Sequence, residues 1–178
     1  MRVKLKQILI EKLDKKVNMY RVIKTAELVF SEELINSCKL NHCGKYNRSW
    51  MCPPAIGNQY NLINRYKSYK YVFVFSKIAY LEDPFDLEGM VQGRKETETV
   101  LKDIRPILKG CDYMTLGPGA CTICKECTYP ALPCRFPDIA IPSLEALGIN
   151  VLELAKSCDI KYYNGPNTVT YFAAIFYN

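Results

Sequence analysis

Seven of the nine cysteines in this 178-residue chain fall within two short stretches that are rich in turn-forming residues. The first stretch contains Cys38, Cys43 and Cys52, and the second contains Cys121, Cys124, Cys127 and Cys134. Proline, glycine and asparagine accompany the cysteines, which argues against a regular helix or strand there. Loops of about 20 residues are uncommon in compact domains unless they have a function or are held by a metal. We therefore expect two long cysteine-rich metal-binding loops.

The number and setting of the cysteines favour reduced thiols over disulfides. Secreted disulfide scaffolds are usually shorter than about 100 residues and carry an even number of cysteines. The first twenty residues are lysine-rich and lack the apolar segment and cleavage site of a secretory signal. No apolar run approaches the roughly 20 residues that a membrane-spanning helix needs. We expect a cytoplasmic protein with no membrane association.

The second stretch carries the more specific pattern, Cys121-x2-Cys124-x2-Cys127, with Cys134 after a longer gap. Bacterial ferredoxins use a Cys-x2-Cys-x2-Cys run for three of the four ligands of a [4Fe–4S] cluster. Zinc sites also use Cys-x2-Cys pairs, usually as two pairs separated by a longer spacer. The pattern favours iron–sulfur over zinc, which remains the alternative. The preceding Gly117-Pro118-Gly119 turn allows close backbone approach, with amides that can donate to cluster sulfurs.

The first stretch, Cys38-x4-Cys43-x8-Cys52 followed by Pro53-Pro54, supplies three thiols and matches no single template. Buried free cysteines in a proline-rich turn are the competing interpretation. Cys111, Cys158 and the single histidine, His42, are candidates for a fourth ligand, although the two isolated cysteines fit a core position equally well. A cluster with three thiolates and one open iron is the remaining option, since an open metal position is what catalytic sites keep.

Hydrophobic periodicity predicts a domain of alternating helices and strands over residues 1–178. Helices are expected at 5–17, 32–35, 59–68 and 87–108, and strands at 20–30, 71–79, 111–116 and 168–177. A last long helix, capped by Ser143, is expected to carry Leu144, Leu147, Val151 and Leu154. The predicted fold class is α/β or α+β, a single domain with a mixed β-sheet flanked by helices.

Three groups of residues resemble the signatures of a prokaryotic family of predicted metal-binding proteins with a cysteine-rich domain of unknown function. The first runs from Cys38 to Pro54 and includes Tyr46 and the sequence RSWMCPP, the second is GPGACTICKEC from Gly117 to Cys127, and the third joins PCRFP at Pro133–Pro137 to PSLEA and Gly148-Ile149. The resemblance covers most of the chain. It implies a metal-binding set made of Cys38, Cys43, Cys52, Cys121, Cys124, Cys127 and Cys134, and it leaves out Cys111 and Cys158.

Three functions compete at this point. The first is an iron–sulfur protein with one or two [4Fe–4S] clusters that passes electrons to a redox partner protein. The second is an enzyme in which a three-cysteine cluster binds a small-molecule substrate, although Glu126 and Asp138 are acid–base candidates by position alone. The third is a structural zinc-binding module. The net charge of +6 is spread along the chain rather than clustered, so we do not expect nucleic acid as a partner.

Overall fold

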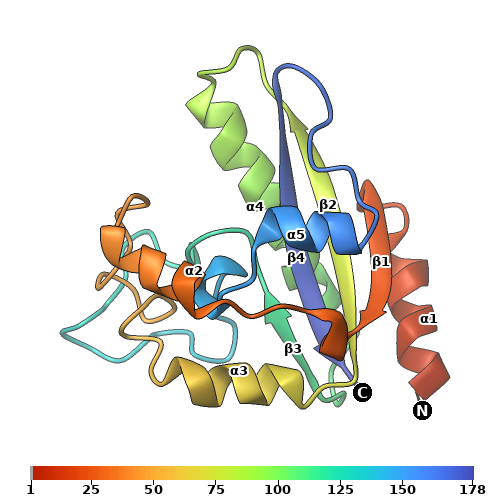
Figure 1. The fold of residues 1–178 in the computed structure, drawn as a ribbon, viewed down its shortest axis with the longest axis horizontal. Helices are drawn as coiled ribbons and strands as arrows, with labels where there is room; N and C mark the ends of the chain where they lie inside the picture. Colours follow the sequence, from red (N-terminus) through yellow and green to blue (C-terminus); the bar gives the residue numbers. More distant parts are fainter. Residues whose placement is uncertain (1) are drawn as a thin grey trace.

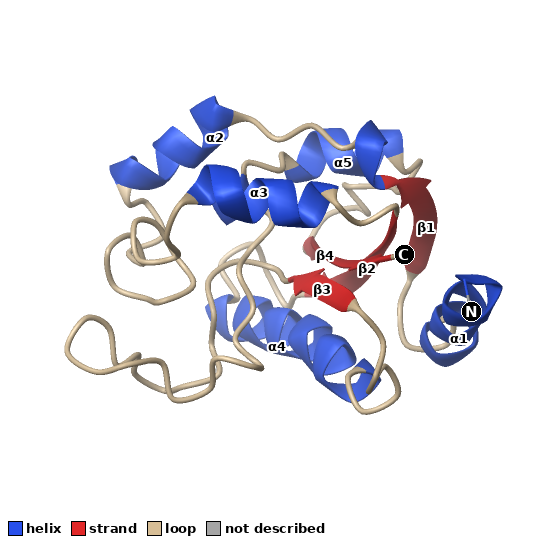
Figure 2. Cartoon of the chain, turned by 90° about the horizontal axis from the view of Figure 1, so that it is seen from below, coloured by secondary structure: helices blue, strands red, loops and turns tan. Residues whose placement is uncertain are grey.

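The computed structural model describes residues 2–178, which form a four-stranded antiparallel sheet with helices on both faces (Figure 1). The strands lie in the order β1-β2-β4-β3. Their bounds are β1 Met19–Lys24, β2 Tyr71–Tyr80, β3 Tyr113–Leu116 and β4 Thr168–Tyr177. The helices are α1 Arg2–Leu13, α2 Glu32–Ser37, α3 Gln59–Lys67, α4 Leu87–Ile104 and α5 Val151–Ser157. Helices α1 and α4 cover one face, and α2, α3 and α5 cover the other (Figure 2).

The two long central strands, β2 and β4, supply the middle of the core. Val72, Phe73, Val74 and Phe75 are fully buried, as are Ile175 and Phe176 of β4. Strands that are covered by helices on both faces have nearly continuous apolar sequences rather than alternating apolar and polar residues. The strands predicted at 71–79 and 168–177 are therefore confirmed.

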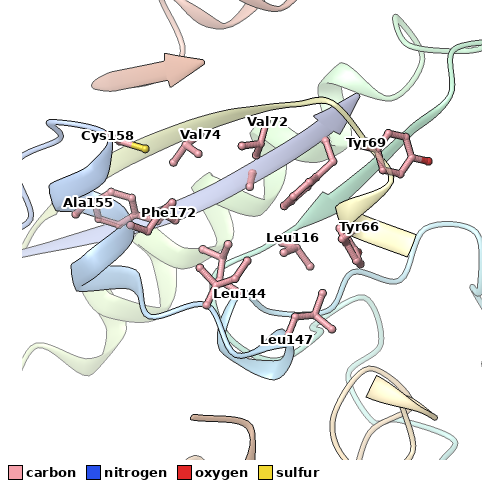
Figure 3. Close-up of a cluster of buried hydrophobic side chains, with 14 of the residues drawn as sticks. Tyr66, Tyr69, Val72, Val74, Leu116, Leu144, Leu147, Ala155, Cys158 and Phe172 are labelled. Carbon is pink, nitrogen blue, oxygen red and sulfur yellow. The ribbon is translucent and has the colours of Figure 1, made fainter. Parts of the chain in front are cut away.

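Each face of the sheet packs its own hydrophobic cluster. Val72, Val74 and Phe172 face α3, α5 and Leu144, together with the thiol of Cys158 (Figure 3). On the other face, Phe73 and Phe75 pack against α1 and α4. The predicted N-terminal helix is confirmed, with Leu5, Leu9 and Leu13 of α1 buried at four-residue spacing, although it ends at Leu13 rather than at Val17.

The sheet is antiparallel throughout, so the α+β alternative is confirmed and the mixed sheet is wrong. Strands β2 and β3 run in the same direction and are joined through α4, as in a parallel crossover. The last strand, β4, lies between them and pairs antiparallel with both. The alternation of helices and strands predicted that strands such as β2 and β3 would pair in parallel. They do not pair, because β4 lies between them.

The long last helix predicted from Ser143 is also wrong. Ser143 begins only a short 3₁₀ turn, Glu145–Leu147, which ends at Gly148. Gly148 has φ = +76°, and a side chain there would meet the backbone oxygen of Ser31 at 2.3 Å. The carbonyl of Gly148 accepts a hydrogen bond from the Ser31 amide (2.8 Å), and Asn150 caps a separate helix, α5. Packing against α2 therefore divides the predicted helix in two.

Smaller differences concern element ends. The first strand stops at Lys24 rather than Phe30, helix α4 ends at Ile104, and β3 begins at Tyr113, two residues after Cys111. Ser31 caps α2 as expected, accepting a hydrogen bond from the Leu34 amide at 3.2 Å. Within residues 2–178 no helix is long and apolar enough to cross a membrane.

Candidate metal centre

The two cysteine-rich stretches lie side by side at one end of the molecule (Figure 2). The first loop, residues 38–58, joins α2 to α3, and the second loop, residues 117–142, joins β3 to the Ser143 turn. A cavity of about 410 Å³ opens between them. It is lined by all four cysteines of the second loop, Cys121, Cys124, Cys127 and Cys134, and by residues of the first loop between Lys45 and Met51.

Aromatic side chains hold the two loops together. The Trp50 indole N–H donates to the carbonyl oxygen of Leu132 at 3.0 Å. Its ring meets the Tyr129 ring edge to face, with centroids 4.9 Å apart. The Tyr129 hydroxyl in turn donates to Asn47 Oδ1 at 2.6 Å. Since these contacts all cross from one loop to the other, Trp50 fixes the width of the cavity.

Cys127 has the surroundings of a thiolate. Burial by itself raises its pKa, but hydrogen bonds from the amides of Tyr129, Trp50 and Thr128 and from the Ser49 hydroxyl favour the ionised form, and the pKa is lowered on balance. Donors aimed at a sulfur are also what tunes a sulfur-ligated metal centre. Ser49 is buried (4% exposed), as an inward-facing hydrogen-bonding group requires.

The first loop holds its thiols in a different setting. Cys52 is buried (7% exposed), and burial raises its pKa to about 11, partly offset by a hydrogen bond with the Ser49 side chain. Burial also raises the pKa of Cys38, which lies within electrostatic reach of Cys43. Cys43 itself is exposed. The three thiols are thus neighbours, and Ser49 links Cys52 to Cys127 across the loops.

The two sets of thiols approach each other at Cys52 and Cys121, whose charges interact. Cys121 is the first cysteine of the second loop, five residues after β3 ends at Leu116. Thr122, beside it, donates a hydrogen bond to Glu98 on α4, and Glu98 faces Arg94 at 3.5 Å. Gly119 has φ = +68°, and a side chain there would lie 3.4 Å from Arg94 Nη1. Glycine is favoured here because of the positive φ, whereas a side chain at that distance would make ordinary contact with Arg94.

Glu145 is a further candidate site residue, which the sequence analysis did not identify. Its Oε2 is buried without a hydrogen-bond partner among the described residues, and burial raises the pKa of the carboxyl. The carboxylate also lies near enough to Cys38 to raise the pKa of that thiol. Its place in the sequence could have pointed to it, since Glu145 is the one acidic residue in the motif PSLEA. A carboxylate thus adjoins the loop that has only three thiols.

Apart from Glu126, the other candidates from the sequence lie outside the cavity. Cys158 packs in the core beneath α5 (1% exposed), where burial raises its pKa to about 11 (Figure 3). Cys111 is exposed at the far end of β3 from the second loop. His42, Glu126 and Asp138 are all exposed, and Glu126 lies on the cavity rim. Within residues 2–178, no three His, Cys, Asp or Glu side chains are already arranged to coordinate one metal ion.

The fold and the two loops define a thiol-rich α+β protein in which four candidate metal ligands, Cys121, Cys124, Cys127 and Cys134, line the inter-loop cavity. The other three, Cys38, Cys43 and Cys52, do not line it. The chain belongs to the family described as predicted metal-binding proteins (DUF2284), whose profile matches residues 21–177. The match spans both loops and all four strands except the first two residues of β1. No curated protein and no solved structure matches the chain. The family description extends to metal binding and specifies neither the metal nor a reaction.

Proposed function

We propose that this protein is an iron–sulfur protein that holds one or two [4Fe–4S] clusters and serves as an electron-transfer or accessory redox protein. One observation carries the proposal: Cys121, Cys124, Cys127 and Cys134, which include the ferredoxin-like run, all line one cavity. Four thiols are the ligand set of a complete cluster. Cys38, Cys43 and Cys52 are the proposed ligands of a second one.

The chemistry of the residues around the thiols fits such a group. Cys127 receives backbone and hydroxyl hydrogen bonds, which stabilise a thiolate ligand without adding a competing ligand. When bound, a [4Fe–4S] cluster supplies a one-electron carrier whose potential depends on these hydrogen bonds and on solvent exposure. Reduced cysteines in this number suit a cytoplasmic protein. Zinc bound by the same thiols is the alternative.

The cavity rim has features of a docking surface for a redox partner protein. Lys45, Arg48 and Lys125 line it, against a single carboxylate, Glu126. Leu132 and Phe136 of the second loop expose 62% and 45% of their surface nearby. A basic rim with exposed apolar side chains suits an acidic partner, because charge complementarity speeds association.

Anaerobic purification followed by iron, acid-labile sulfide and zinc analysis tests the proposal. We expect iron and sulfide in equal amounts and an electron paramagnetic resonance signal after reduction. Two clusters correspond to about eight irons per chain and one cluster to about four. Stoichiometric zinc without sulfide would contradict the proposal and favour the zinc module.

A second candidate function is an enzyme that uses a three-cysteine cluster with an open iron to bind a small-molecule substrate. The Glu145 carboxylate near Cys38, whose Oε2 has no hydrogen-bond partner among the described residues, favours it, because an acid–base group next to an open metal position is a common catalytic pairing. Glu145→Gln keeps the size of the side chain and removes the carboxylate. We expect it to alter the resonance signal of one cluster while total iron stays unchanged. An identical signal would remove the support for this candidate.

A further inference from the structure

A second cavity, of about 540 Å³, lies next to the inter-loop cavity, between α3, β3 and the end of the second loop. Its apolar wall includes Met51, Leu62 and Met114. Its charged groups are Arg65, Arg105 and Asp138, so the lining has one more cation than anion. Pockets of about 300–1,000 Å³ with an apolar wall and a few charged groups are typical of small-molecule sites.

Arg105 is the residue in this cavity whose hydrogen bonding is incomplete. Its Nη2 donates to the carbonyl oxygen of Ile139 at 2.6 Å. Its Nη1 is buried and has no hydrogen-bond partner among the described residues. None of the ion pairs within residues 2–178 includes Arg105 or Arg65. A buried N–H of a cation that lacks an acceptor is costly, so Arg105 is the lining residue that gains most from an acceptor within reach of its guanidinium.

The cavity adjoins the cysteine loops. Met51 and Ala140 line both cavities, and Met51 directly precedes Cys52. The charge of Arg105 also interacts with that of Cys121. A ligand held on Arg105 would therefore lie beside the place where the two sets of thiols approach each other.

We propose that this cavity binds a small organic anion, whose carboxylate or phosphate group pairs with Arg105 and whose apolar body packs on Met51, Leu62 and Met114. A guanidinium pairs well with both kinds of oxyanion because it presents parallel N–H donors. Arg65, on the exposed side of α3, adds a second cation at the mouth. That the anion is a substrate depends on the proposed function, whereas its binding to the cavity does not.

The five methionines provide the measurement, because Met51 and Met114 line the cavity while Met19 and Met90 do not. The full chain, labelled with [methyl-13C]methionine, is titrated anaerobically with benzoate and with phenyl phosphate. Benzyl alcohol is the neutral control of the same shape. We expect at least one anion to shift the Met51 and Met114 signals saturably, leaving the Met19 and Met90 signals in place. Which of the two binds distinguishes a carboxylate ligand from a phosphate ligand.

Two arginine variants connect the binding to charge. Arg105→Gln and Arg65→Gln are each expected to weaken anion binding, by about tenfold for Arg105. Arg65→Gln is the safer variant, since its side chain makes no hydrogen bond in the structure that the fold would lose. Arg21→Gln is the matched control. Arg21 lies on β1, at the opposite edge of the sheet from β3, and its guanidinium pairs with Asp159.

The inference is overturned if neither anion shifts Met51 and Met114, if benzyl alcohol shifts them equally, or if neither cavity variant weakens binding. Iron and sulfide are measured on the same samples. Anion binding to a protein that contains no iron or sulfide would contradict the proposed function and support this inference. Iron and sulfide in a protein that binds neither anion would support the proposed function and contradict this inference.

Discussion

The two cysteine loops differ in how they present their thiols. In the second loop all four cysteines are half-buried and line one cavity. In the first loop the three thiols range from exposed, at Cys43, to buried, at Cys52. The second loop supplies a full set of sulfur donors, whereas the first has Glu145 near its first thiol instead of a fourth cysteine. If the proposed function holds, the second loop is the one that can complete a cluster with its own cysteines, and the first is the one that leaves a metal position open.

The same residue type has opposite properties in the two loops. Burial dominates at Cys52 and raises its pKa, whereas hydrogen-bond donors dominate at Cys127 and lower its pKa. Ser49 lowers the pKa of both thiols, so the difference comes from the deeper burial of Cys52 and from the backbone amides around Cys127. Local backbone conformation, rather than the number of cysteines, therefore distinguishes the loops.

Single cysteine replacements should give the largest effect and test the division between the loops directly. Cys124→Ser is expected to lose one cluster's iron, while Cys43→Ser should lose iron from the other loop or leave a cluster with an altered resonance signal. Cys111→Ser is the control, since this exposed thiol lies outside the cavity, and it should keep all the metal. Iron and sulfide analysis is the measurement. Unchanged iron in Cys124→Ser would mean that the second loop is not a cluster site.

Replacement of Trp50 tests whether the loops depend on each other. Trp50→Phe keeps a ring against Tyr129 and removes the N–H bond to Leu132, which should cost about 1 kcal/mol. Trp50→Ala removes both contacts and should cost about 2–3 kcal/mol, below the value for a fully buried tryptophan. Denaturant unfolding of the metal-free chain measures both. Faster loss of metal to a chelator from one loop alone would show that the loops are independent.

Ser49→Ala removes a hydroxyl that hydrogen-bonds a thiol in each loop, Cys52 in the first and Cys127 in the second. We expect a loss of about 1 kcal/mol of unfolding free energy and a shift in the reduction potential, because a hydrogen bond to the sulfur ligand disappears. Ser37→Ala is the control, since its exposed hydroxyl donates only to the Leu34 carbonyl. A potential that is unchanged in Ser49→Ala would mean that the hydroxyl does not influence a cluster.

The smallest expected effect is the pH dependence of stability that comes from Cys158. This thiol lies outside both loops and serves as a reference for them. Its pKa is raised by burial from 9.0 to about 11, so the unfolded chain loses the proton at lower pH than the native chain. The stability that depends on this group is present below about pH 9 and decreases as the pH rises toward 11. At pH 8 iodoacetamide should label Cys111 quickly and Cys158 slowly in the native protein. Equal labelling rates would place Cys158 outside the core.

Several features of the fold and the candidate site could be predicted from the sequence. The strands at 71–79 and 168–177 were identifiable because their apolar runs reflect burial on both faces. The position of the second loop followed from its prolines and glycines, and the Ser31 cap from its local sequence. Ser49 and Glu145 could not be identified, because their importance comes from thiols that are distant along the chain or on another loop.

The sequence by itself determined which residues carry sulfur, where the backbone must turn, and which strands are buried, since these depend on residue type and local spacing. Only the tertiary structure decided that β4 lies between β2 and β3, and that Gly148 divides the predicted last helix by packing on Ser31. It also decided that the two loops share a cavity through Trp50, and that Arg105 retains an unpaired N–H beside them. These are contacts between distant segments, and their energies depend on the whole packed arrangement rather than on any one stretch.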